Sequence, residues 1–383
     1  MLTAYDPPAR EHAGVHRAAI TTIFFLNGGA FSSWYARLPA IQDDLGLGPG
    51  LIGLALLGAP AGLLLAQPAV GGAIARRGSR PLLVLAPLFF LAVLLPALAI
   101  NVATLLVAVL VAGAANGALD IAMNAQGVAV ERVTGTRLFT SLHAAFSFGA
   151  LAGAGAAGAI ASTGLEPLPH LAMVAVLAAI IAAVLRPAFL RDEASADAKA
   201  ARLARPDRRL AGLGAIAFCA LLAEGAVFDW SSIYLDGEAG AGPGLAPLGL
   251  AAFSLTMGIG RLAGDRIAER LGAGRVASGG LVLAGAGLAL ALVTGTPPGG
   301  LIGFALMGLG LANAFPLTLR ASEGARSGPT GPALAAISTV GYTGFLLGPP
   351  AIGLVAEATG LRASLGLVVA LCVAAAVLAA RGW

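Results

Sequence analysis

Long apolar runs alternate with short polar segments along the whole chain. Each run is close to the ~20 residues that an α-helix needs to cross a bilayer. Twelve such runs occur, at residues 17–41, 51–75, 81–100, 103–129, 138–162, 168–187, 210–235, 246–268, 276–295, 299–319, 332–356 and 361–381. The pattern predicts an all-α integral membrane protein with twelve transmembrane helices.

The longest polar interruption, residues 186–209, divides these spans into six and six. The motif GAAN at 113–116 returns as GLAN at 310–313, in the equivalent part of the second group. Such a duplication predicts two pseudo-symmetric six-helix bundles, an arrangement typical of secondary transporters. The predicted domains are a tail at 1–16, an N-terminal bundle at 17–187, a linker at 188–209 and a C-terminal bundle at 210–383.

Composition agrees with a membrane location. Of the 383 residues, 58% are hydrophobic and only 11% are charged, and the mean hydropathy is +0.89. These values exclude a soluble globular protein. The two cysteines, Cys219 and Cys372, lack disulfide or metal-ligand spacing, so we expect both to be packing residues. Residues 1–16 are polar, and we expect the first span itself to direct membrane insertion.

The basic residues predict an orientation, because arginine and lysine in short loops stay on the cytoplasmic side. With both termini in the cytoplasm, all of the 23 basic residues except Arg37 and Arg362 fall on that side. The net charge of +4 then reflects orientation, and nucleic-acid binding is not needed to explain it. Arg37, on the outer side, is a candidate for a gate or an outer funnel.

One helical face of the fourth span is polar. At about 100° per residue, Asn116, Asp120, Asn124 and Glu131 fall within roughly 80° of arc. A charge deep in a bilayer costs from ~3 to more than 10 kcal/mol and usually marks an ion or substrate route. We predict that Asp120 carries a proton and that Asn116 and Asn124 contact a substrate. The alternative is that these groups join helices by hydrogen bonds.

The seventh span repeats this chemistry in the second half. Glu224 lies near the bilayer midplane, with Phe228 on the same face, and we predict that Glu224 is a second proton carrier. Asp229, five residues further on, is expected to point elsewhere and to approach the outer interface.

His143 is the only histidine well inside an apolar run. It lies near the level of Asn124, so we predict that its ring hydrogen-bonds the stripe formed by Asn124 and Asp120 and shares their proton. A satisfied packing histidine is the alternative.

Loop motifs resemble those of the major facilitator superfamily, whose second-to-third loop carries GxxxDRxGRR. The stretch GGAIARRGSR at 71–80 matches at Gly71, Arg76, Gly78 and Arg80, with Ala75 in place of aspartate and Ser79 in place of arginine. The missing aspartate is expected to weaken the charge relay of this loop. The equivalent loop after the eighth span keeps Glu269, Arg270 and Gly272 in the acidic, basic and glycine positions.

With twelve spans and a central linker, the chain is identified as a member of this superfamily. The segments MNAQGVAVE, SLHAAFSFGALAGA, EGAVFDWSSIYL and GYTGFLLGPPAIGLVAE resemble the YbjJ-like branch of bacterial inner-membrane facilitators, related to the fucose-permease group. The resemblance implies a multi-pass protein of the bacterial cytoplasmic (inner) membrane. It also implies that spans 1, 4, 7 and 10 line a central cavity.

Further candidates follow from that arrangement. In the first span, Asn27, Phe31 and Trp34 share a face at i, i+4 and i+7, so they are candidates for stacking and hydrogen bonding with a solute. The alternative is a packing stripe in which Trp34 and Tyr35 are anchors at the outer interface.

The tenth and eleventh spans add two more candidates. In the tenth span, Asn313 precedes the helix-kinking Pro316. In the eleventh, Tyr342 is predicted to lie opposite His143 and Ser147.

At the inner surface, two charge pairs are gating candidates. Arg76 with Glu131, and Arg270 with Glu323, would each tie the end of an even-numbered span to its neighbour, with Glu269 in the acidic motif position. Ordinary loop charge is the alternative, since exposed pairs contribute only about 0 to 1 kcal/mol.

Together these features predict a proton-coupled secondary active transporter for a small neutral polar or cationic solute. The predicted proton-coupling residues are Asp120, Glu224 and His143, and the predicted substrate contacts are Asn27, Phe31, Trp34, Asn116, Asn124, Ser147, Phe228, Asn313 and Tyr342. A drug/proton antiporter for amphipathic cations, a membrane-embedded enzyme and a channel are the alternatives. We predict a monomer in the bilayer that uses neither a metal nor a cofactor.

Overall fold

The described residues, 12–192, 208–323 and 330–382 of a computed structural model, are almost entirely helical. Ten spans in them are long and apolar enough to cross a membrane by length and composition. The helix α2 (Ala13–Tyr35) and the segmented stretch at 80–98 complete the set of twelve. The all-α, twelve-span prediction is confirmed.

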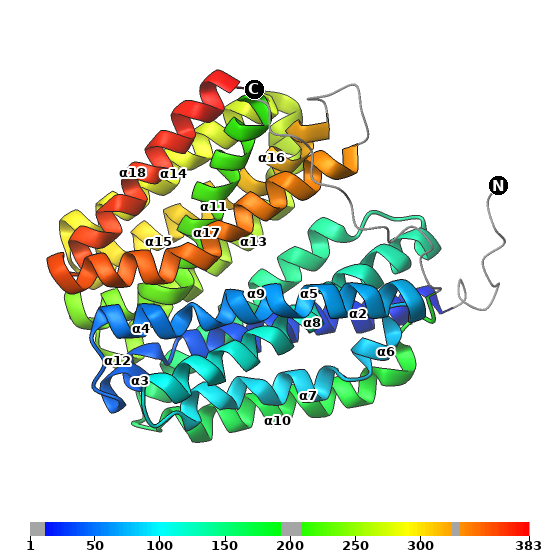
Figure 1. Cartoon of the computed structure of the whole chain (residues 1–383), viewed down its shortest axis with the longest axis horizontal. Helices are drawn as coiled ribbons and strands as arrows, with labels where there is room; N and C mark the ends of the chain where they lie inside the picture. The colour runs from blue at the N-terminus through cyan, green and yellow to red at the C-terminus, as the bar shows by residue number, and fades with distance from the viewer. Residues whose placement is uncertain (1–11, 193–207, 324–329, 383) are drawn as a thin grey trace.

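The spans form two bundles that lie side by side (Figure 1). The first bundle contains α2, α4 (Pro49–Leu56) continued by α5 (Gly58–Arg77), the short segments α6 (Arg80–Leu83), α7 (Ala86–Leu91) and η1 (Ala92–Leu98), α8 (Val102–Thr134), α9 (Phe139–Ala161), and α10 (Pro167–Leu185) with η2 (Arg186–Ala188). The second contains α11 (Arg208–Ile233) with the π-turn η3 (Tyr234–Glu238), α13 (Leu248–Leu271), α14 (Ala273–Thr294), α15 (Pro297–Leu311) with α16 (Ala314–Glu323), α17 (Thr330–Thr359) and α18 (Leu361–Gly382). Two short helices, α3 (Leu38–Asp44) and α12 (Gly242–Leu245), lie at one end.

Helix packing repeats from one bundle to the other. In the first, α2 packs on α9, α5 on α8 and α7 on α10, which pairs spans 1 with 5, 2 with 4 and 3 with 6. In the second, α11 packs on α17, α13 on α15 and α14 on α18, which are the same pairs. The duplication that short motifs predicted is therefore present in the packing.

Glycines bring paired helices into backbone contact. A Cβ built on Gly149 of α9 would lie 1.9 Å from the carbonyl oxygen of Phe25 in α2, and one on Gly344 of α17 would lie 2.4 Å from that of Phe218 in α11. Only glycine fits such positions, as is common where membrane helices associate.

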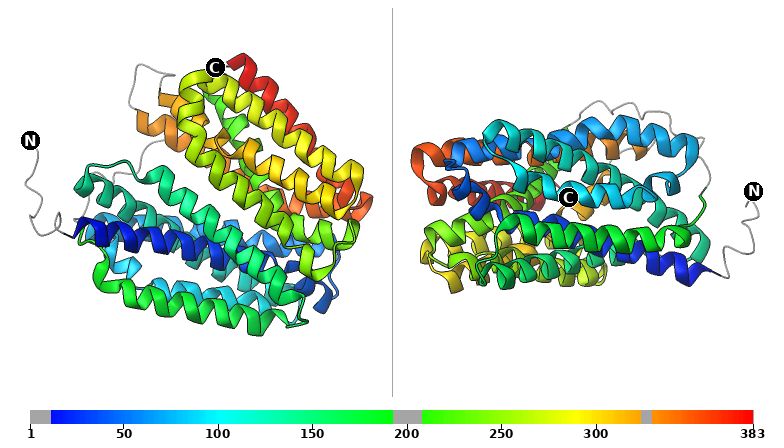
Figure 2. Two further views of the ribbon diagram at one scale, coloured as in Figure 1. Left: turned by 180° about the vertical axis from the view of Figure 1, so that it is seen from behind. Right: turned by 90° about the horizontal axis from the view of Figure 1, so that it is seen from below.

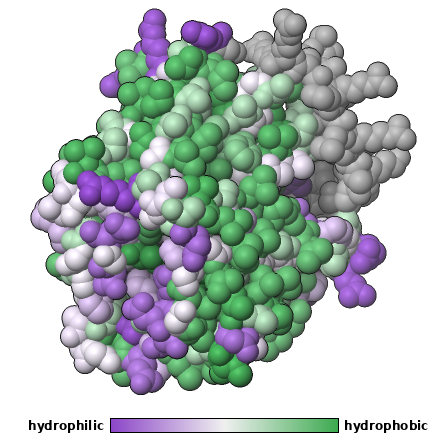
Figure 3. All heavy atoms as spheres, turned by 60° about the vertical axis from the view of Figure 1, so that its left-hand side comes forward, coloured by the Kyte–Doolittle hydropathy of each residue, from purple (hydrophilic) through white to green (hydrophobic). Residues whose placement is uncertain are grey.

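The two bundles touch near the end that carries α3 and α12, which we call the closed end. There α4 packs on α17 and α9 packs on α13. The ribbons diverge toward the end where α2 begins and α18 ends, which we call the open end (Figures 1 and 2). Apolar side chains cover the flank of the molecule, and hydrophilic ones gather toward the closed end (Figure 3). Such an apolar flank suits contact with lipid.

Proline breaks two spans. Residues 80–98 contain Pro81, Pro87 and Pro96, and the stretch divides into α6, α7 and the 3₁₀ helix η1 instead of one continuous helix. It packs between α8 and α10. The tenth span breaks at residues 312–313, because Pro316 has no N–H to bond the carbonyl of Ala312.

Candidate functional site

A cavity of about 270 Å³ lies between the two bundles. Its walls come from α2, α5, α8 and α9 on one side and from α11, α13, α16 and α17 on the other. Three carboxylates line it, Asp120 from the first bundle and Glu224 and Asp229 from the second. Arg261 is the single lining arginine or lysine among the described residues. Acidic groups from both halves therefore border one space.

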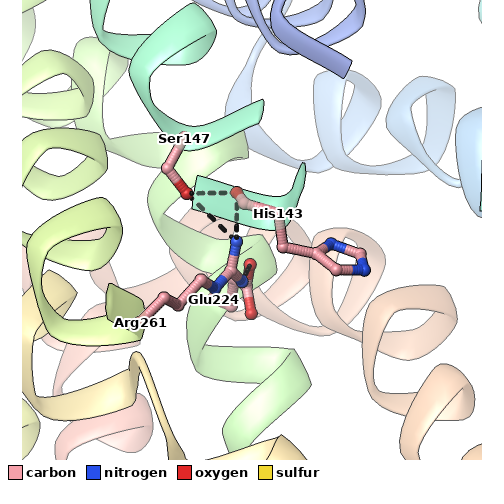
Figure 4. Close-up of polar contacts among 4 residues, drawn as sticks. All are labelled: His143, Ser147, Glu224 and Arg261. Carbon is pink, nitrogen blue, oxygen red and sulfur yellow. Dashed lines mark hydrogen bonds and ion pairs between the residues drawn. The ribbon is translucent and has the colours of Figure 1, made fainter. Parts of the chain in front are cut away.

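Arg261 connects the two bundles inside this cavity (Figure 4). Its Nη2 lies 3.4 Å from Oε1 of Glu224, and both side chains are less than one-fifth exposed. Its Nη1 donates to Oγ of Ser147 at 3.1 Å and to the carbonyl oxygen of His143 at 3.5 Å, both on α9. The sequence analysis counted Arg261 among the inner-surface charges, and this was wrong. The position lies well inside α13, which runs ten residues further to Leu271.

Asn124 hydrogen-bonds Asp120 within α8. Its Nδ2 donates to Oδ1 of Asp120 at 3.1 Å and to the backbone carbonyl of the same residue at 2.8 Å, one turn back on α8. Asn124 does not line the central cavity, whereas Asn116 does. The Asn124 amide orients the carboxylate of Asp120, and its predicted contact with substrate stays a prediction.

His143 lines the cavity, but its ring does not engage the polar stripe. It lies edge-on to Phe24 and Phe139, with ring centroids 5.5 and 4.5 Å away. No hydrogen bond joins the ring to Asn124 or Asp120 in the part of the chain that the structure describes, so that expectation is wrong. The aromatic neighbours turn the ring away from Arg261 and Glu224 (Figure 4).

Tyr342 shares the cavity lining with the acids of both halves. It lines the cavity from α17, and both Asp120 and Glu224 act on it electrostatically. The prediction placed it opposite His143 and Ser147. The structure shows His143 in the same lining, whereas Ser147 is 3% exposed and is held in the contact with Arg261. Ser147 therefore positions Arg261 and does not border the cavity.

The face of α2 toward the cavity is Asn27, Phe31 and Tyr35, at i, i+4 and i+8. Trp34 is 1% exposed and turns toward α7 and η1, where it borders a separate space of only about 10 Å³. Trp34 therefore does not line the central cavity, because this side of α2 is covered by the third span. Trp34 and Tyr35 are both buried and pack on each other, with ring centroids 4.0 Å apart, which agrees with the alternative of an aromatic packing stripe.

Asp229 was expected near the outer interface, and it lines the central cavity instead, 5% exposed. The lining residues of α11 are Leu221, Glu224, Gly225, Phe228 and Asp229. At 100° per residue they cover an arc of about 140°, with the two acids at its edges. The cavity-lining surface of α11 is therefore wider than the single face expected from the sequence, and it includes Asp229.

Asn313 is a structural residue. Its Nδ2 donates to the carbonyl of Gly260 at 2.9 Å, and its side chain fills the space beside Gly264, where a Cβ would lie 1.9 Å from Oδ1. Asn313 is absent from the cavity lining, and its predicted contact with substrate stays a prediction. The side chain joins the break in the tenth span to α13.

With the geometry described, comparison with known proteins decides the family. A family model described as Major Facilitator Superfamily matches residues 20–319 and, in a second match, 213–382. The chain belongs to the major facilitator superfamily. The facilitator is 34% identical over 347 residues to an MFS-type transporter of Yersinia pestis, covering 90% of each chain. It is 33% identical over 353 residues to the membrane protein MosC of Rhizobium meliloti, covering 92% of this chain and 86% of MosC.

Solved structures agree on the fold of the facilitator. A mutant of the nucleoside transporter NupG superposes with a TM-score of 0.74 at 14% identity, covering 96% of this chain and 99% of that one. The fucose:proton symporter FucP of E. coli gives 0.63 at 19% identity, covering 95% and 97%. The relatives and the family are transporters, so the facilitator is a membrane transporter and not an enzyme. The narrower YbjJ-like branch stays a prediction.

The predicted gating pairs differ from the structure of the facilitator. Oε1 of Glu131 accepts hydrogen bonds from the backbone N–H of Leu138 and, at 2.8 Å, of Phe139. It therefore caps the start of α9 and does not pair with Arg76, because free helix N–H groups compete for a nearby carboxylate.

The second predicted pair cannot be compared, since the side chain of Glu323 lies outside the described residues. Glu269 and Arg270 are exposed. At this end Arg320 pairs with Asp265 at 2.8 Å, and both side chains are more than half exposed.

A carboxylate does reach the loop that lacks the family aspartate. Asp192, just after the sixth span, accepts hydrogen bonds from the backbone N–H of Ser79 at 2.7 Å and of Arg80 at 3.2 Å. Ser79 also donates to Gln126 of α8 at 3.3 Å. The sequence analysis missed Asp192, whose only signal was an acidic residue directly after the sixth span.

Arg37 lines a second cavity, of about 480 Å³, at the closed end. Its side chain is 5% exposed, and its Nη2 donates to the carbonyl of Leu165. Burial lowers the pKa of this guanidinium, and nearby Asp44 opposes that effect.

No cluster of three or more His, Cys, Asp or Glu residues that could hold a metal ion occurs in residues 12–192, 208–323 and 330–382.

Proposed function

We propose that this facilitator is a proton-coupled secondary active transporter that moves a small neutral polar or cationic solute by alternating access. The observation that carries the proposal is the central cavity, which holds carboxylates from both bundles and one arginine that is already paired. Neutralising a buried carboxylate changes its interactions strongly, because charge in a low-dielectric site is costly unless it is paired.

Glu224 is the acid best placed to couple a proton to movement. It orients Arg261, which in turn contacts Ser147 on the opposite bundle. When Glu224 gains a proton, Arg261 loses its counter-charge, and the contact between bundles weakens. Asp120, held by Asn124 and close to Tyr342, is the second acid. The His143 ring has no hydrogen-bonded route to either acid among the described residues, so the proposed coupling rests on the two acids.

The charge of the cavity indicates which class of solute it can bind. With Arg261 neutralised by Glu224, Asp120 and Asp229 remain, which favours neutral or cationic solutes over anionic ones. The same acids would serve uptake or the efflux of amphipathic cations.

We place the open end, where α2 begins and α18 ends, on the cytoplasmic side of the bacterial inner membrane, because basic residues concentrate there. We further propose that the transporter acts as a monomer.

The test is transport by purified protein in liposomes with an imposed pH gradient. A panel of radiolabelled sugars, nucleosides and organic cations is offered with the gradient in each direction. We expect uptake of at least one solute that depends on the gradient, and loss of that dependence in Glu224→Gln and Asp120→Asn. If both variants transport with unchanged pH dependence, the coupling assignment is wrong. The direction that drives accumulation separates symport from antiport.

A further inference from the structure

Asp229 is a buried carboxylate that the proposed coupling does not use. It lines the central cavity and is only 5% exposed. No hydrogen bond and no ion pair reaches it within the described part of the chain. A charged group in that position is expensive unless something neutralises it, and the described protein supplies no such partner. A positively charged ligand would supply the partner that the protein does not.

Three aromatic rings line the same cavity as this carboxylate. The rings of Phe31 and Tyr35 lie 4.8 Å apart, centroid to centroid, and Phe228 lies 6.3 Å from Phe31 and 5.8 Å from Tyr35. Two of the rings come from α2 and one from α11, so the cluster spans both bundles. Asp229 is close enough to Tyr35 to act on it electrostatically.

Three rings and a carboxylate are the chemistry that recognises an organic ammonium group. The faces of aromatic rings attract cations, and they do so most strongly where water is excluded. A carboxylate adds the counter-charge that a neutral ring cannot supply. Neutral solutes would gain the stacking but would leave Asp229 unpaired.

The approach from the closed end has the same sign. Asp43, Asp44, Glu166 and Asp236 line the 480 Å³ cavity there, and Arg37 is the single cation in its lining among the described residues. Asp236 lies seven residues beyond Asp229, about 10 Å further along the helix axis. A cleft lined by acidic groups raises the local concentration of cations. Both cavities therefore favour a positively charged solute.

We propose that Asp229, with Phe31, Tyr35 and Phe228, forms an ammonium-binding subsite, and that the transported solute is an organic amine. The inference rests on the proposed transport function for its physiological meaning. Its physical content, selective binding of an ammonium group, is independent of proton coupling and can be measured without a gradient.

The experiment compares charged probes with uncharged carbon isosteres on purified full-length protein. Choline is paired with 3,3-dimethyl-1-butanol, and benzyltrimethylammonium with neopentylbenzene. Binding is measured by thermal stabilisation across a concentration series. We expect at least one cation to bind more tightly than its isostere, and Asp229→Asn to weaken that cation about tenfold or more while leaving the isostere unchanged.

The matched control is Asp265→Asn, which removes one negative charge outside the cavity, where Asp265 pairs with Arg320. It should keep the preference for the cation. A second variant, Phe228→Leu, should weaken the cation with the charge intact. The unliganded Asp229→Asn protein should be at least as thermostable as the parent, because no hydrogen bond is lost.

Three results overturn the inference: neither cation is preferred over its isostere, Asp229→Asn keeps the preference, or Asp229→Asn unfolds because the carboxylate is structural. None of these results depends on whether transport is proton-driven. Conversely, a selective site with pH-independent transport would leave the ammonium subsite in place and remove only the coupling proposal.

Discussion

The contact between α4 and α17 gives the sharpest conformational prediction. Gly53 of α4 lies against the backbone of α17, where a Cβ would stand 2.6 Å from the carbonyl oxygen of Pro349 and 3.0 Å from Cα of Gly353. Ordinary van der Waals contact begins near 3.4 Å, so Gly53→Ala requires the helices to separate by about 0.8 Å. Both obstructing groups are backbone atoms, and neither can rotate aside.

The magnitude follows from overpacking. Forcing one extra methyl group into a close-packed contact costs about 1 to 3 kcal/mol. Alanine also favours the helix over glycine by about 0.5 to 1 kcal/mol, but this gain is the same whether the end is closed or open, so it cancels. Only the closed form bears the clash. The ratio of open to closed molecules at this end should therefore rise about 5- to 150-fold.

The assay is a pair of spin labels across the closed end. Thr163, after α9, and Glu238, at the end of η3, are exposed and belong to opposite bundles. Cysteines at these positions are labelled in a background without the buried Cys219 and Cys372. Pulsed electron paramagnetic resonance then reports the distribution of distances, and Gly53→Ala should increase the longer ones.

The control is Gly155→Ala in α9, where an added Cβ meets nothing within 4 Å. It should leave the distribution unchanged. A Gly53→Ala distribution that matches the parent would show that the α4–α17 contact does not hold this end together. Glu357→Gln tests the same contact between α4 and α17 in a second way. Oε2 of Glu357 accepts the N–H of Gly50 at 2.9 Å, and the negative charge of the carboxylate strengthens that hydrogen bond.

Three further predictions concern residues that the structure places in packing or capping positions. Asn313→Ala should lower the free energy of unfolding by about 1 to 3 kcal/mol without changing substrate affinity, because the carbonyl of Gly260 loses its donor; denaturation and binding assays check both parts. Trp34→Ala should cost about 3 to 5 kcal/mol, since the side chain is fully buried, whereas Val107→Ala on the exposed flank should cost far less. Glu131→Gln should slow transport little and lower the melting temperature modestly, because an amide still accepts the N–H groups that start α9 but carries no charge; parent-like pH dependence with a large loss of transport would instead restore a gating role.

Much of the architecture could be predicted from the sequence, because the length of an apolar run and the effect of a proline depend on neighbouring residues in the chain. The spans follow from runs near 20 residues, and the break in the tenth span follows from Pro316. The acids Asp120 and Glu224 were found for the same reason, since a carboxylate in an apolar run is conspicuous wherever it points.

The errors share one cause, which is that a helix in a bundle has neighbours on several sides. The face of Asn27 and Phe31 was correct, but its continuation was Tyr35 and not Trp34, a choice made by the third span. Arg261 looked like an inner-surface charge because other basic residues follow it closely in α13. Which of them turns inward depends on α9, and no periodicity in α13 records that.

The broken third span has a consequence for how the protein is made. Nineteen residues in a regular α-helix would rise about 28 Å, and the 3₁₀ segment at Ala92–Leu98 adds about 3 to 4 Å, so this short stretch still reaches across a membrane. It does so with fewer regular hydrogen bonds than its counterpart α14, and α8 and α10 cover it on either side. Both of those helices are synthesised later. The third span can therefore gain its full packing only after the sixth span has been synthesised. We expect the amino-terminal bundle to assemble late as a unit and not helix by helix.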